Sequence, residues 1–167
     1  MLTAWSRPWL YLLIASFLLS SCWSVLSEDN PALSGQGQQL PVTAQLPVAG
    51  QVIDLEVAQT PEQQAKGLMF REQLAPNRGM LFAFSPPRVA RFWMKNTLID
   101  LDMIFVYQGR IVMILDRVPP CRQDPCPVYG PWAEVDQVIE LAAGQAEHLG
   151  LKVGDSLTVR AVSSPKP

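Results

Sequence analysis

The chain has 167 residues, of which 13 are Lys or Arg and 15 are Asp or Glu, so its formal net charge is −2. This length fits one domain with flanking segments. The slightly acidic balance argues against nucleic acid as a partner, because phosphate binding needs a basic surplus. The single histidine excludes a metal site with several histidine ligands and disfavours a Ser-His-Asp triad.

Residues 1–21 have the features of a lipoprotein signal peptide. Arg7 is the only charged residue before Glu28, and the apolar run at residues 9–19 is shorter than the roughly 18 residues of a membrane-spanning helix. The run ends in Leu19-Ser-Ser-Cys22, which resembles the lipobox of bacterial lipoproteins. The resemblance implies an acylated (palmitate-type) Cys22 and a protein anchored to the cell membrane or outer membrane, facing the periplasm or exterior. The alternative is a plain secretory signal with an incidental cysteine.

Residues 22–50 are expected to form a flexible tether. Ser, Gln, Gly and Pro dominate its centre and offer little surface to bury. A linker of this size spans roughly 25–30 Å, which would hold the domain off the lipid surface. We expect the β-rich domain at residues 51–162, a disordered tail at residues 163–167, and a monomer without a cofactor.

The domain is expected to begin with a strand and a short helix. Apolar and acidic residues alternate over residues 52–57, as in a half-buried strand. The motif Thr60-Pro-Glu-Gln63 predicts a helix start with a capping box, and Gly67 can end the helix in a left-handed conformation. Further strands are expected at residues 79–84 and 89–94, separated by a break at Ser85-Pro-Pro87.

The clearest pairing signal is a hairpin. Residues 101–107 and 110–116 flank Gln108-Gly109, a two-residue turn with glycine second. In that register Asp100 faces Arg117, and both faces of the hairpin are largely apolar, which predicts a closed or covered sheet. Asp102 then shares a face with an aliphatic row, so its carboxylate needs hydrogen bonds or a cation.

The remaining pattern predicts a strand at residues 138–141, a short helix at 142–149 and a last strand at 155–162. Glu140 interrupts the first of these apolar strands, much as Asp102 interrupts its own. The expected fold is therefore mainly β (α+β), with two short helices.

A disulfide is predicted between Cys121 and Cys126. If Cys22 is lipidated, these two cysteines remain, and the compartment is oxidising. Redox chemistry and soft-metal binding are the alternatives, but the four intervening residues do not match the two-residue spacing of redox and zinc motifs.

A family resemblance emerges from motifs that occur in order along residues 51–162. They are Glu56-Val-Ala58, Gly67-Leu-Met-Phe-Arg71, Gly79-Met-Leu-Phe82, Phe92-Trp-Met-Lys-Asn-Thr97, Leu101-Asp-Met-Ile-Phe105, Ile139-Glu-Leu141 and Gly150-Leu-Lys-Val-Gly-Asp155. Together they resemble the domain of unknown function 192 family. The resemblance implies a compact, mostly β, barrel-like domain that is often secreted or lipid-anchored, without an established activity.

A polar constellation is the predicted site. Its members are Arg71, Trp93, Lys95 and Asn96 with Asp102 and Glu140. Cations supply donors for an anionic group, the amide both donates and accepts, and the indole offers a stacking plane. This mixture suits a small polar or anionic ligand or a sugar, without catalytic or metal-binding residues.

Three alternatives to such a binding site stay open. The first is a hydrolase of an envelope glycan that uses Asp102 and Glu140 as acid and base. The second is a structural or assembly factor of the envelope. The third is a polar network in which the cations only neutralise the carboxylates. Six cations and one acid lie between Lys66 and Lys95. This run produces a local positive field that can attract an anion, or it simply forms a solvated basic face.

Overall fold

A computed structural model describes residues 35–163. The predicted signal peptide, Cys22 and the last four residues lie outside this range. The nine strands are β1 (Val42–Val48), β2 (Gln51–Ala58), β3 (Arg78–Arg88), β4 (Phe92–Trp93), β5 (Leu101–Tyr107), β6 (Arg110–Val118), β7 (Val128–Tyr129), β8 (Val135–Ala142) and β9 (Arg160–Ala161). The two helices are α1 (Pro61–Lys66) and α2 (Gln145–His148). The predicted mainly β fold with two short helices is confirmed.

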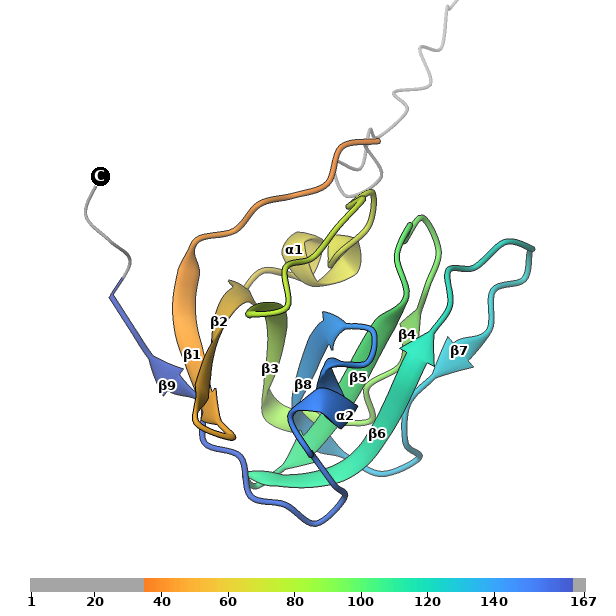
Figure 1. The fold of residues 1–167 in the computed structure, drawn as a ribbon. Coiled ribbons are helices and arrows are strands. Elements are labelled where there is room, and N and C mark those ends of the chain that lie inside the picture. Colours follow the sequence, from red (N-terminus) through yellow and green to blue (C-terminus); the bar gives the residue numbers. More distant parts are fainter. Residues whose placement is uncertain (1–34, 164–167) are drawn as a thin grey trace, which may run out of the picture.

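The strands form one curved, seven-stranded sheet and one small two-stranded sheet (Figure 1). The large sheet has the order β6-β5-β8-β3-β2-β1-β9, and the small sheet pairs β4 with β7. Only β2 and β3 run parallel, because α1 carries the chain back between them. The large sheet is not closed into a barrel, although it curls like one.

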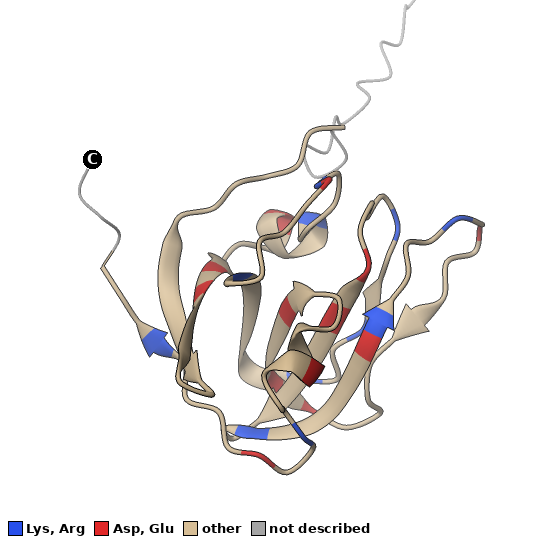
Figure 2. Cartoon of the chain, in the orientation of Figure 1, with Lys and Arg blue, Asp and Glu red and all other residues tan. Residues whose placement is uncertain are grey.

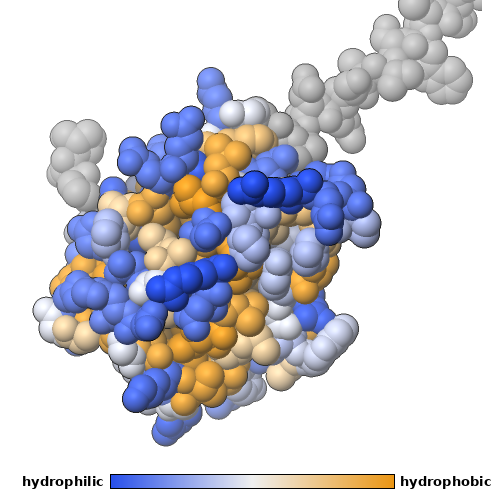
Figure 3. All heavy atoms as spheres, turned by 45° about the vertical axis from the view of Figure 1, so that its right-hand side comes forward, coloured by the Kyte–Doolittle hydropathy of each residue, from blue (hydrophilic) through white to orange (hydrophobic). Residues whose placement is uncertain are grey.

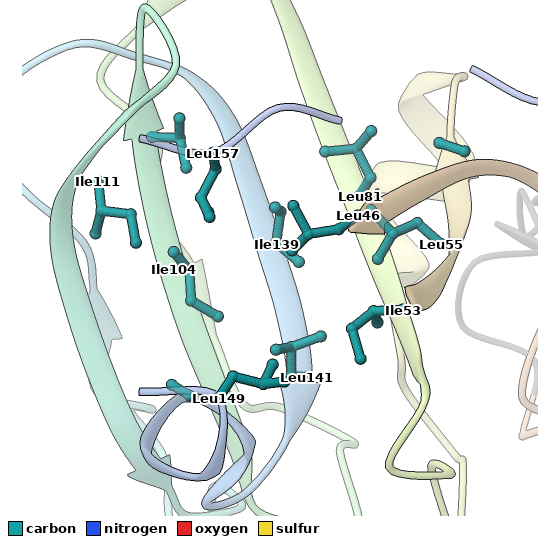
Figure 4. Close-up of a cluster of buried hydrophobic side chains, with 13 residues drawn as sticks. Leu46, Ile53, Leu55, Leu81, Ile104, Ile111, Ile139, Leu141, Leu149 and Leu157 are labelled. Carbon is teal, nitrogen blue, oxygen red and sulfur yellow. The ribbon is translucent and has the colours of Figure 1, made fainter. Parts of the chain in front are cut away.

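Two hydrophobic clusters cover the two faces of this sheet. Ile104 and Val106 of β5 point into one cluster, whereas Met103 and Phe105 point into the other. The first cluster is enclosed by the curved sheet together with α2 and Leu157 (Figure 4). The prediction that both faces are covered is confirmed for β5, whose successive residues supply both clusters, whereas the edge strand β6 stays partly exposed.

The predicted tether extends too far. Residues 42–48 form β1, which pairs with β2 on one side and with β9 on the other. Only two apolar side chains of β1, Ala44 and Leu46, are fully buried, and Pro47 within the strand has no backbone N–H to donate. The strand therefore depends on its two neighbours rather than on a strong pattern of its own.

The Gln108-Gly109 turn is confirmed, but the predicted hairpin register is wrong beyond it. Tyr107 pairs with Arg110, and then irregularities between Phe105 and Val106 and between Leu101 and Met103 shift the pairing. Leu101 consequently lies opposite Val118. The predicted contact of Asp100 with Arg117 is replaced by a bond from Arg117 Nη2 to Glu147 Oε2 at 3.0 Å.

Three other predictions concern local geometry. The capping box at Thr60 and Gln63 is confirmed, with both reciprocal hydrogen bonds present. The disulfide between Cys121 and Cys126 is confirmed as well. The predicted break at residues 85–87 is wrong, because β3 continues to Arg88 with an irregular register against β8.

The structure describes no helix that is long and apolar enough to cross a membrane.

Candidate functional site

A pocket of about 450 Å³ opens on the outer face of the sheet. It lies between α1 with its following turn, the end of β3, strand β4, and one residue of β8. Four aromatic residues line it, namely Phe82, Phe84, Phe92 and Trp93. The ionisable residues in its lining are Lys66, Arg88, Arg91 and Glu140. A pocket that combines apolar walls with a few ionisable groups is typical of small-molecule sites.

The turn after α1 is held in place by its backbone. The Phe70 amide donates to the Asn96 carbonyl oxygen at 2.8 Å, and the Asn96 side chain reaches the Met69 sulfur at 3.9 Å. Asn96 adopts a left-handed backbone conformation with φ of 57°, which asparagine tolerates better than most residues. Its observed contacts therefore join two loops at one side of the pocket. The predicted ligand contact of Asn96 remains a prediction.

Glu140 lies at the inner end of the pocket. It is 5% exposed, and its cross-strand neighbours Met80 and Met103 are fully buried. Among the described residues, none donates a hydrogen bond or an ion pair to its carboxyl group. Burial therefore raises the pKa of Glu140 to about 8, because the charged form loses its hydration without gaining a partner.

Arg88 and Arg91 are exposed residues of the pocket lining. The Arg88 guanidinium lies 4.1 Å from the centre of the Phe84 ring and donates to Gln64 Oε1, and both of these partners line the pocket. The Arg91 guanidinium lies 3.7 Å from the Trp132 ring and donates to the Gly130 carbonyl oxygen, and neither of these partners belongs to the lining. Both guanidinium groups keep further N–H donors.

Arg71 does not line the pocket. Its Nη1 donates to Glu56 Oε1 at 2.9 Å, its Nη2 pairs with Glu56 Oε2, and its Nε donates to the Gln38 carbonyl oxygen at 3.0 Å. Both side chains of this ion pair are buried. Glu56 Oε2 also accepts from the Leu40 amide at 2.7 Å, so the pair ties residues 38–40 to β2.

Asp102 is fully engaged by the backbone. Its Oδ1 accepts from the amides of Arg117 at 2.8 Å and Gly144 at 3.0 Å, and its Oδ2 accepts from the Ala146 amide at 2.8 Å. The irregular pairing of β6 presents the first amide, and the start of α2 presents the other two. The prediction that this carboxylate needs hydrogen bonds or a cation is thus met by three backbone N–H groups.

The two carboxylates suggested as an acid and base pair lie on opposite faces of the sheet. Asp102 pairs with Leu141, whereas Glu140 pairs with Met103. Directly opposed residues share a face, so the side chains of Asp102 and Glu140 point in opposite directions. Figure 2 shows acidic residues within several strands of the sheet. Glu140 lines the pocket and Asp102 does not, so the two carboxylates do not share it.

The remaining predicted residues divide between the pocket and the surface. Trp93 lines the pocket and is 49% exposed. Lys95 Nζ lies 3.4 Å from Asp124 Oδ1 in the disulfide loop and 5.7 Å from the Trp93 ring centre. Of the six predicted residues, the structure therefore places Trp93 and Glu140 in the pocket lining. It does not bring Arg71, Lys95, Asp102 and Glu140 together.

The sequence interpretation missed the pocket cations as site residues. Lys66, Arg88 and Arg91 all belong to the basic run between Lys66 and Lys95, which was interpreted only as a general positive field. Their presence in one lining depends on how α1, the end of β3 and the loop before β4 are placed in space, so only the excess of cations could have indicated it.

The titration of Glu140 leads to a pH prediction. The native state holds this proton to a higher pH than the unfolded state, so the unfolded state binds fewer protons between about pH 4.5 and 8. The contribution to stability is fully present below pH 4.5 and is lost as pH rises, by at most about 1.4 kcal/mol per pH unit. Glu140→Gln, which cannot titrate, removes this slope.

Urea unfolding of wild type and Glu140→Gln at pH 5.5 and pH 8 checks this prediction. The variant should gain stability relative to wild type as pH rises. Parallel pH profiles would contradict the raised pKa.

The fold and the pocket define a small, mainly β domain with a buried acid at the inner end of a cation-bearing pocket. The model of the family DUF192, described as an uncharacterised ACR, matches residues 44–159. The chain belongs to this family, as the ordered motifs predicted. No curated protein matches the chain.

Two solved structures are similar to this chain. A protein of unknown function from Novosphingobium aromaticivorans DSM 12444 is 36% identical with a TM-score of 0.63, covering 71% of this chain and 84% of its own. A protein from Sinorhizobium meliloti 1021, described provisionally as a transcription regulator, is 34% identical with a TM-score of 0.64. That match covers 74% of this chain and 98% of the other.

In the part of the chain that the structure describes, no group of three or more His, Cys, Asp or Glu residues is arranged to hold a metal ion.

Proposed function

We propose that this chain is a lipid-anchored protein of the cell envelope whose domain binds a small anionic ligand in the pocket beside α1. The observation that carries the proposal is the exposed Arg88 guanidinium against the aromatic wall of the pocket, with Arg91 as a second cation of the lining. Guanidinium groups offer several donors to a carboxylate or phosphate, and aromatic walls bury an apolar body. The predicted sugar remains one such ligand if it carries an anionic group.

The electrostatics of the pocket supports an anionic ligand. Arg88 and Arg91 carry positive charge, and the Glu140 carboxyl is largely neutral near pH 7 because burial raises its pKa to about 8. Glu140 therefore does not cancel the charge of these arginines under these conditions. Their positive field favours entry of an anion, and the low-dielectric walls strengthen the contact once the ligand is bound.

A thermal-shift screen of organic anions and envelope sugars tests the binding proposal. At least one anion should stabilise wild type, and the double variant Arg88→Gln/Arg91→Gln should lose that stabilisation, because both guanidinium groups are removed from the lining. Arg122→Gln in the disulfide loop is the matched control, since Arg122 is exposed and does not line the pocket. If every compound stabilises the double variant as much as wild type, binding at this pocket is wrong.

The proposed membrane anchor has its own test. Metabolic labelling with a palmitate analogue should label the wild-type protein and fail to label Cys22→Ser, because the lipobox-like motif places acylation on that cysteine. Fractionation should then move the variant away from the membrane. Labelling that persists in the variant would overturn the anchor and leave the pocket proposal untouched.

A further inference from the structure

The carboxyl group of Glu140 is the least satisfied polar group of the pocket. It is 5% exposed, it faces the pocket, and it has no hydrogen-bond or ion-pair partner among residues 35–163. Asp102 is also buried in the sheet but accepts three backbone hydrogen bonds. The contrast matters, because a buried polar group without a partner costs free energy that a bound molecule can restore.

The two ends of the pocket differ in chemistry. Arg88 and Arg91 are exposed residues of the lining, and the Arg88 guanidinium lies against the Phe84 ring, whereas Glu140 is buried at the inner end. No ion pair joins this carboxyl group to either guanidinium within the described residues, so the cations do not satisfy the acid. A complementary molecule therefore presents an acceptor with negative charge outward and a donor inward.

The walls between these ends are apolar. Phe82 and Phe92 contact each other edge to face, with ring centres 5.0 Å apart, and Leu68 and Met69 complete the lining beside them. Figure 3 shows that hydrophobic and strongly hydrophilic side chains lie side by side on the surface of this domain. Such walls favour a ligand whose middle part is an apolar chain or ring.

We infer that the pocket binds a small zwitterion, in which an ammonium group contacts Glu140 and a carboxylate contacts Arg88 and Arg91 across an apolar body. This inference rests on the proposed function, because it names the class of the anionic ligand. An ammonium is preferred to a hydroxyl at the inner end because it offers three donors and forms charge-assisted hydrogen bonds, which are about twice as strong as neutral ones.

Binding of this kind moves a proton. In the free protein at pH 7 the Glu140 carboxyl is mostly protonated, since its pKa is raised to about 8. The arriving ammonium favours the carboxylate, so the carboxyl proton passes to the buffer while the ligand amine keeps its own protons. Uptake of the zwitterion therefore releases close to one proton per bound molecule.

Three compounds built on the same benzene ring test the contributions of the carboxylate and the ammonium separately. They are para-(aminomethyl)benzoate, para-methylbenzoate and benzylamine, measured by isothermal titration calorimetry at pH 7. The zwitterion should bind wild type at least about tenfold more tightly than para-methylbenzoate, which equals about 1.4 kcal/mol. Titrations in phosphate and in Tris, which differ in ionisation enthalpy, should show proton release for the zwitterion and none for para-methylbenzoate, while benzylamine, which lacks the carboxylate, should bind more weakly than the zwitterion.

Substitutions at each end of the pocket test which protein group contacts which charge of the ligand. Glu140→Gln should lower the affinity for the zwitterion to that for para-methylbenzoate and abolish proton release. The double variant Arg88→Gln/Arg91→Gln should weaken binding of both the zwitterion and para-methylbenzoate. The control Arg122→Gln should weaken binding of neither compound. Equal affinity of the two carboxylates for wild type, without proton release, overturns the zwitterion and leaves anion binding intact. If neither carboxylate binds, the anion site itself is wrong and the inference falls with it.

Discussion

Arg71→Met is expected to lower the free energy of unfolding by about 3–5 kcal/mol, because it leaves the buried Glu56 carboxylate without its cation. The pair has two Arg–Glu contacts, and the arginine also holds the Gln38 carbonyl oxygen. Urea unfolding at neutral pH measures the loss. The effect belongs to folding, so the variant should still respond to pocket ligands at temperatures where it remains folded.

Two companion variants make the result specific. Arg78→Met breaks the exposed contact of Arg78 with Asp54, at 3.9 Å, and should cost less than about 1 kcal/mol. The double variant Arg71→Met/Glu56→Leu removes both charges and should recover part of the loss, since the uncompensated carboxylate is gone. A small effect of Arg71→Met, equal to that of Arg78→Met, would contradict a structural role for the buried pair.

Asp102→Ala is the second substitution with a large expected effect, about 3 kcal/mol or more. It leaves three backbone N–H groups without their acceptor, and two of these belong to the start of α2. The helix has only four residues, so it cannot persist without this anchor. Urea unfolding gives the total loss, and amide exchange at Ala146 should accelerate specifically.

The control for this experiment is Asp155→Ala. Asp155 Oδ2 accepts one exposed hydrogen bond, from the Lys152 amide at 2.8 Å, so its removal should cost about 1 kcal/mol or less. If Asp102→Ala is as mild as this control, the three amides find water instead and the carboxylate is not a structural anchor. Preserved ligand binding in the folded fraction of Asp102→Ala would agree with its position on the face away from the pocket.

Local sequence signals predicted local structure well. The capping box of α1, the turn at Gln108-Gly109 and the disulfide each involve residues at most five positions apart, so the necessary contacts are encoded within one short segment. The strand period of two also placed Asp102 correctly on the same face of β5 as Ile104 and Val106. These features depend on backbone geometry and period rather than on distant partners.

Contacts between distant segments were not predictable in the same way. Arg71 was expected to meet a carboxylate, but its partner is Glu56 on β2 rather than Asp102 or Glu140. Two irregularities in the β5–β6 register, which no residue type demands, displaced Arg117 from Asp100 and turned its amide toward Asp102. Several carboxylates interrupt apolar strands, and the sequence alone does not choose among them.

The candidate site shows the same division. Trp93 and Glu140 both lie in the pocket lining, but the arginines of that lining are Arg88 and Arg91 rather than the predicted Arg71. Arg88 is at the end of a strand and Arg91 lies on a loop, where no periodicity fixes the direction of a side chain. The basic run indicated that cations were numerous, and only the tertiary fold determined which of them line the pocket.

One short segment near the carboxyl terminus protects both borders of the large sheet. Ser156 bridges to Arg110 at the start of β6, and a few residues later Arg160 and Ala161 pair with β1. Unpaired strand borders recruit strands from other molecules. A strand from another molecule would have to displace these few residues in order to pair at either place, so a change in this one segment would act on both borders at once.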